Sequence, residues 1–61
     1  MVTEFEAIQK VVRISTKEYP DEILIVYEKE DGTYDFCLEC EYLGADESVR
    51  GHYINGHMTP I

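Results

Sequence analysis

Residues 23–42 constrain the fold more than any other part of the chain, because their pattern is typical of a β-hairpin. Two runs rich in β-branched and aromatic residues flank Asp31-Gly32, a pair favoured in the type I′ turns that join adjacent strands. A two-residue loop fixes the register by counting outward from the turn. It predicts that Tyr27 faces Phe36 and that Ile25 faces Leu38.

This register predicts one apolar and one acidic face, because side chains alternate across a sheet. The apolar face would form the core and hold Ile23, Ile25, Tyr27, Tyr34, Phe36, Leu38 and Cys40. The other face would hold the carboxylates of Glu28, Asp35, Glu39 and Glu41 beside a small apolar patch of Leu24, Val26 and Cys37. Glu28 and Asp35 would lie directly opposite each other, where like charges cost stability.

A helix is predicted before the hairpin. Thr3 followed by Glu6 fits a capping box. The stripe expected to face the sheet recurs at helical spacing and comprises Phe5, Ile8, Val12, Thr16 and Tyr19. The helix should end before Pro20, because the residue preceding a proline disfavours helical backbone. A strand remains the alternative, since Ile8, Val12, Ile14 and Thr16 also fit a period of two.

A second type I′ hairpin is predicted at Asn55-Gly56, with residues 49–54 pairing with residues 57–61. Pro60 cannot donate to a ladder, so the last strand should be short and at an edge. The predicted fold is α+β: one N-terminal helix packed on a small antiparallel sheet of three or four strands, in the order α-β-β-β-(β). The 61 residues have room for a single domain, residues 1–61.

Charge is the strongest indication of function. The chain has 13 acidic and 5 basic residues and a net charge of −8, and Lys29 is the only base between residues 18 and 47. Such a surface repels phosphate, so we expect no direct binding to nucleic acid or to an anionic membrane. It attracts a basic protein partner, and the predicted partner-binding residues are Glu28, Asp35, Glu39 and Glu41. Solubility is the alternative explanation of the charge.

The rest of the composition predicts a cytoplasmic protein. No apolar run approaches the roughly 20 residues that cross a bilayer. The N-terminus carries Glu4 and Glu6 and lacks the basic and apolar regions of a signal peptide. The two cysteines are therefore expected to be reduced thiols.

Neither metal binding nor catalysis is expected from the sequence. Cys37, Cys40, His52 and His57 approach the spacing of a C2H2 zinc site. Cysteines three apart in one strand would point to opposite faces, however, so we predict no metal and no cofactor. The chain has no glycine-rich phosphate loop and no evident catalytic triad, and a single small core leaves little room for a substrate cleft. We predict no catalytic residue and no enzyme activity.

Self-association is expected because a domain of this length is marginally stable alone. Two groups of apolar residues lie outside the predicted core, and together they form the predicted homo-oligomer interface. They are Ala7, Val11 and Ile14 on the helix, and Leu24 and Val26 on the sheet. The sequence thus predicts a small, self-associating interaction protein that binds a protein partner through an acidic sheet face. The alternatives are a phage-type acidic DNA mimic that inhibits a nucleic-acid-binding protein, and a small zinc-binding module.

Overall fold

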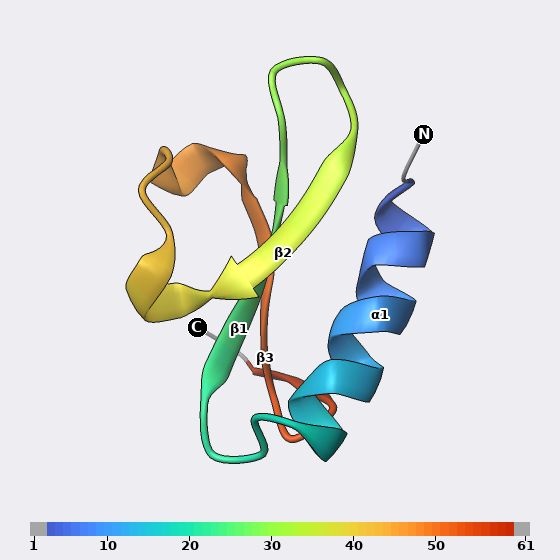
Figure 1. Cartoon of the computed structure of the whole chain (residues 1–61). Coiled ribbons are helices and arrows are strands. Elements are labelled where there is room, and N and C mark those ends of the chain that lie inside the picture. The colour runs from blue at the N-terminus through green and yellow to red at the C-terminus, as the bar shows by residue number, and fades with distance from the viewer. Residues whose placement is uncertain (1–2, 60–61) are drawn as a thin grey trace.

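The structure, a computed structural model that describes residues 3–59, contains one helix and a four-stranded antiparallel sheet (Figure 1). The elements are α1 (Glu4–Lys17), β1 (Ile23–Glu28), β2 (Tyr34–Leu38), β3 (Val49–Ile54) and β4 (His57–Thr59). The strand order is β2-β1-β3-β4. Helix α1 covers one face, and the β2–β3 connection, residues 39–48, lies on the other (Figure 1). The predicted fold class is confirmed.

Helix α1 begins and ends where the sequence predicts. The backbone N–H of Glu6 donates to Thr3 Oγ1 at 3.2 Å, and the Glu6 carboxylate accepts from the Thr3 N–H at 3.3 Å, which completes the capping box. The helix ends at Lys17, before Pro20. No helix within residues 3–59 has the length and apolarity needed to cross a membrane.

The predicted core-facing stripe of the helix was wrong. Ala7, Val11 and Ser15 are the buried residues of α1, whereas Phe5 is 68% exposed. Tyr19 and Thr16 are also exposed. The buried side chains are small, so the helix can approach the sheet closely, and the larger Ile8, Val12 and Ile14 pack beside them.

The first hairpin has a register one residue away from the predicted one. The N–H of Lys29 donates to the carbonyl of Thr33 at 2.7 Å, which leaves a three-residue loop ending at Gly32, with φ of +87°. Asp31 Oδ1 stabilises this loop by accepting from the Thr33 N–H at 3.0 Å and from its hydroxyl at 2.6 Å. Val26 therefore faces Phe36, and Tyr27 faces Asp35.

The new register exchanges the two faces of β1. Leu24 and Val26 face the helix and form the core with Ala7, Val11 and Tyr53. Ile25 and Tyr27 lie on the opposite face, so the prediction that they share the core face with Phe36 and Leu38 was wrong.

The predicted oligomer interface was wrong because most of its residues belong to the core. Leu24 is 2% exposed, and Ala7, Val11 and Val26 are fully buried within the chain's own core. Ile14 packs against that core. Four of the five predicted interface side chains therefore offer no apolar surface to a second copy, and Ile14 is half-buried.

The second hairpin follows the sequence prediction. Asn55 and Gly56 have positive φ values of 49° and 81°, as a type I′ turn requires, and β4 lies at the edge of the sheet. The predicted pairing is present as far as Thr59, and Pro60 and Ile61 lie outside the described residues. The turn is fastened to the helix, because the Gly56 N–H donates to the hydroxyl of the buried Ser15 at 2.7 Å.

Candidate functional site

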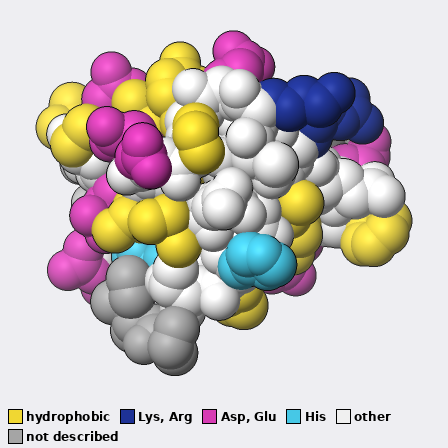
Figure 2. Space-filling model, turned by 90° about the horizontal axis from the view of Figure 1, so that it is seen from below, with side chains coloured by type: hydrophobic (Ala, Val, Ile, Leu, Met, Phe, Trp, Pro, Cys, Tyr) yellow, Lys and Arg dark blue, Asp and Glu magenta, His cyan; other side chains and the backbone are white. Residues whose placement is uncertain are grey.

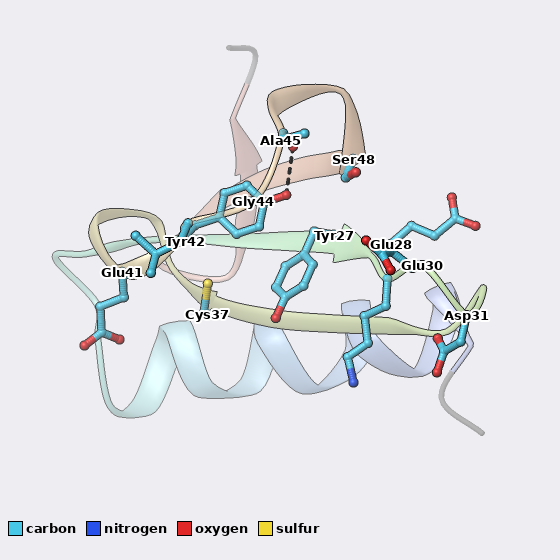
Figure 3. Close-up of a pocket in the computed structure, with 12 residues that line it drawn as sticks. Tyr27, Glu28, Glu30, Asp31, Cys37, Glu41, Tyr42, Gly44, Ala45 and Ser48 are labelled. Carbon is cyan, nitrogen blue, oxygen red and sulfur yellow. Dashed lines mark hydrogen bonds between the residues drawn. The ribbon is translucent and has the colours of Figure 1, made fainter.

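An open hollow of about 910 Å³ lies on the sheet, beside the first hairpin turn and the β2–β3 connection (Figure 3). We call it the acidic hollow. Its lining residues are Tyr27, Glu28, Lys29, Glu30, Asp31, Cys37, Glu41, Tyr42, Leu43, Gly44, Ala45 and Ser48. They come from β1, the hairpin turn, β2 and the β2–β3 connection.

Two tyrosines hold the connection against the sheet. The rings of Tyr27 and Tyr42 have centroids 4.9 Å apart and are tilted by 44°. The Tyr42 hydroxyl donates to the carbonyl of Ala45 at 2.8 Å, the bond drawn dashed in Figure 3. Gly44 lies so close to the Tyr42 ring that a Cβ at this position would collide with it. The aromatic contact, the hydrogen bond and the glycine together define the wall of the hollow.

The lining carries four carboxylates and one ammonium group. The carboxylates belong to Glu28, Glu30, Asp31 and Glu41, and Lys29 is the one basic residue among the lining side chains. Lys29 Nζ lies 3.8 Å from Asp35 Oδ2, and both side chains are nearly half exposed. The Glu28 carboxylate accepts from Arg50 at 2.7 Å, which raises the pKa of that guanidinium. Negative charge therefore exceeds positive charge around the hollow.

The predicted partner-binding carboxylates do not all lie on one strand face. Glu28 and Glu41 both line the acidic hollow. Asp35 faces Tyr27 and Glu28 faces Tyr34, so the predicted direct opposition of Glu28 and Asp35 was wrong. Strand β2 ends at Leu38, so Glu39 and Glu41 belong to a short 3-10 turn, η1 (Glu39–Glu41), and Glu39 Oε2 lies 3.5 Å from His52 Nε2.

Two groups inside the hollow, the Tyr27 phenol and the Cys37 thiol, stay protonated at neutral pH. Burial raises the pKa of Tyr27, and the negative charge of Asp35 adds to the effect. Burial, followed by the carboxylates of Glu41 and Asp35, raises the pKa of the Cys37 thiol. Because the thiolate is the nucleophile, Cys37 is poorly suited to attack a substrate at neutral pH. Of these causes, only the carboxylates of Glu41 and Asp35 also favour a bound cation, because burial disfavours either sign of charge.

The cysteines and histidines weighed as zinc ligands are dispersed. Cys37 is half-buried beside the acidic hollow, whereas Cys40 is exposed in η1 rather than buried in a strand as predicted. His52 and His57 lie on the same face of the second hairpin, at diagonal positions. Between residues 3 and 59, no three side chains of His, Cys, Asp or Glu come together as a metal site.

Three basic side chains are grouped on the helix. Lys10, Arg13 and Lys17 are exposed on α1. Seen from below, Lys and Arg side chains gather on the side of the helix, while acidic and apolar side chains mix on the opposite side (Figure 2). Three of the five basic residues therefore lie on α1, whereas Lys29 lines the acidic hollow and Arg50 pairs with Glu28.

Sequence reasoning did not identify Tyr42, Leu43 and Gly44 as site residues, because residues 44–48 read as an ordinary connecting loop. The available signal was an aromatic and an aliphatic residue directly before Gly44. Leu43 is 98% exposed and lies at the hollow.

Comparisons of the chain with family models, with curated proteins and with solved structures gave no match.

Proposed function

We propose that this protein is a non-enzymatic interaction module whose acidic hollow binds a basic segment of a protein partner. The observation that carries the proposal is the lining of the hollow. Four acidic residues line it together with two tyrosines and the exposed Leu43, and the one lysine is already near a carboxylate of its own.

Each component suits a lysine or arginine side chain. Carboxylates attract the charged end and accept its hydrogen bonds. Tyrosine rings attract a cation over their faces, with a contribution of about 0.5–1 kcal/mol at exposed sites. Leu43 offers apolar surface to the methylene groups that such side chains bury while their charged ends stay in water. Long-range attraction from the net charge of −8 adds to the rate of association.

The test is the affinity of a fluorescent lysine-rich peptide, measured by anisotropy at low and at moderate salt. The double variant Glu30→Gln/Glu41→Gln removes two carboxylates of the hollow. The double variant Glu18→Gln/Glu22→Gln removes the same charge from exposed positions outside the lining and is the matched control. Each exposed ion pair contributes about 0.2–1 kcal/mol, so the loss of two should make the hollow variant bind about twofold to thirtyfold more weakly than the control.

Two results would contradict the proposal. Equal losses in both double variants would mean that only the net charge attracts the peptide. An acidic peptide of equal length that bound as tightly as the basic one would remove the electrostatic basis altogether.

A further inference from the structure

The outer edge of β2 borders the acidic hollow, and no described strand pairs with it. Figure 1 shows β2 as an edge strand, with α1 on one side of the sheet and the β2–β3 connection on the other. An uncovered edge presents backbone N–H and C=O groups that can pair with another extended chain.

The hydrogen-bonding pattern identifies which groups point outward. Lys29 and Thr33 form a hydrogen-bonded pair, so the alternate pairs that follow it, Tyr27 with Asp35 and Ile25 with Cys37, also direct their backbone groups inward. The outward groups of β2 consequently belong to Tyr34, Phe36 and Leu38.

One of these outward groups has a side-chain partner. The N–H of Phe36 donates to Oδ1 of Asp35 at 2.8 Å. The same carboxylate has Lys29 Nζ 3.8 Å from its other oxygen. The Asp35 carboxylate thus covers one backbone N–H of the edge. Its side chain is 46% exposed, so another acceptor can displace it. Two copies pairing through this edge would bring their Asp35 carboxylates together, which disfavours self-pairing.

We infer that the β2 edge binds an extended basic segment of the partner as a fifth strand, with its basic side chains directed to Asp35 and the acidic hollow. This inference rests on the proposed function and adds the mode of binding. An incoming cation replaces Lys29 near Asp35, and the partner's backbone carbonyl replaces Asp35 as the acceptor for the Phe36 N–H. Main-chain hydrogen bonds then supply affinity, and side chains at alternate positions supply specificity.

The two faces of the edge specify the chemistry of the segment. On the hollow side, partner residues beside Asp35 and Cys37 meet carboxylates, including Glu41, whose charge acts on Cys37. On the helix side, partner residues lie beside Tyr34, Phe36 and Leu38, which are half-buried and pack against the core. The segment therefore alternates basic residues with uncharged or apolar ones.

The experiment uses a short peptide in which lysine and threonine alternate, together with two N-methylated forms. One form carries N-methyl groups on every lysine, and the other on every threonine. Backbone groups alternate in direction along a strand, so only one of the two sets faces β2. That form should bind at least about tenfold more weakly, since it loses several main-chain hydrogen bonds, whereas the other should bind like the parent peptide.

Asp35→Asn keeps an acceptor for the Phe36 N–H and removes the charge. It should lower the affinity for the parent peptide by up to about fivefold. Glu18→Gln, with the same charge change on the helix layer, should not. In hydrogen exchange, the Phe36 amide should become more protected when the parent peptide is bound.

Parent binding that is unaffected by either N-methylation pattern, or weakened equally by both, overturns strand addition. If such binding still depends on Glu30 and Glu41, the proposed function stands without it. Failure of the parent peptide to bind at all overturns both.

Discussion

The Ser15–Gly56 hydrogen bond should contribute measurably to stability, although it joins a single hydroxyl to a single N–H. Ser15 is fully buried, accepts from the Gly56 N–H at 2.7 Å and donates to the Val12 carbonyl at 3.2 Å. Ser15→Ala removes the acceptor and leaves a backbone N–H without its partner, at a cost of about 1–3 kcal/mol. The better helix propensity of alanine offsets roughly 0.5 kcal/mol of this loss.

Thr16→Ala is the matched control. The Thr16 hydroxyl also donates to the Val12 carbonyl, at 2.8 Å, and it lies beside Gly56, but it is exposed and the Gly56 N–H donates to Ser15 instead. Its removal should change the free energy of unfolding by less than about 0.5 kcal/mol. Both side chains lie beside Gly56, so the difference between the two variants reports on the Ser15–Gly56 hydrogen bond.

Urea unfolding followed by circular dichroism gives both free energies. Ser15→Ala should be about 0.5–2.5 kcal/mol less stable than the parent chain, and each kcal/mol should lower Tm by roughly 4–8 °C in a domain of this size. The Gly56 amide should also exchange faster with solvent in Ser15→Ala. If the two variants are equally stable and Gly56 exchange is unchanged, the bond contributes nothing and this reasoning is refuted.

Three further outcomes are expected. Leu24→Ala should lower the free energy of unfolding by about 2–5 kcal/mol because it leaves a cavity, whereas Leu43→Ala, at a 98% exposed position, should change it by less than about 0.5 kcal/mol in the same urea titration. Iodoacetamide should alkylate the exposed Cys40 before Cys37, because the pKa of the Cys37 thiol is raised by burial and by Glu41; mass spectrometry of the labelled peptides would contradict this if Cys37 reacted first. Hydrogen bonds from Thr33 hold the pKa of Asp31 below its ordinary value of 3.8, so its contribution to stability is present above that pH and is lost as the pH falls through the lower folded-state pKa. The Tm difference between the parent chain and Asp31→Ala should therefore shrink in acid, and a difference that grew instead would contradict the assigned hydrogen bonds.

The elements of the fold could be predicted from the sequence, but the register of the first hairpin could not. Asp31-Gly32 fits a two-residue loop and also the end of a three-residue loop, and the two differ by one residue in register. Strand β1 is apolar at five successive positions, 23–27, so alternation does not say which face is the core. Strand β2 does alternate, and Tyr34, Phe36 and Leu38 share one face as predicted.

The helix face was mispredicted because small residues carry little hydrophobic signal. Ala7 and Ser15 are less hydrophobic than Phe5 and Tyr19, yet they are the side chains buried against the sheet. The acidic character of the site could be predicted from charge alone. Its shape could not, because it depends on how Tyr42 and Gly44 fold the β2–β3 connection back onto Tyr27.

The strand order has a consequence for the folding reaction. Each hairpin closes over a short loop, but β1 and β3 pair across the whole β2 strand and the β2–β3 connection, and Ser15 reaches Gly56 over 41 positions of the chain. Closing such loops lowers the entropy of the chain before any stabilising contact has formed. An isolated two-stranded hairpin is at best marginally stable in water. Neither hairpin is therefore expected to be stable by itself, and the chain should fold and unfold as a single cooperative unit.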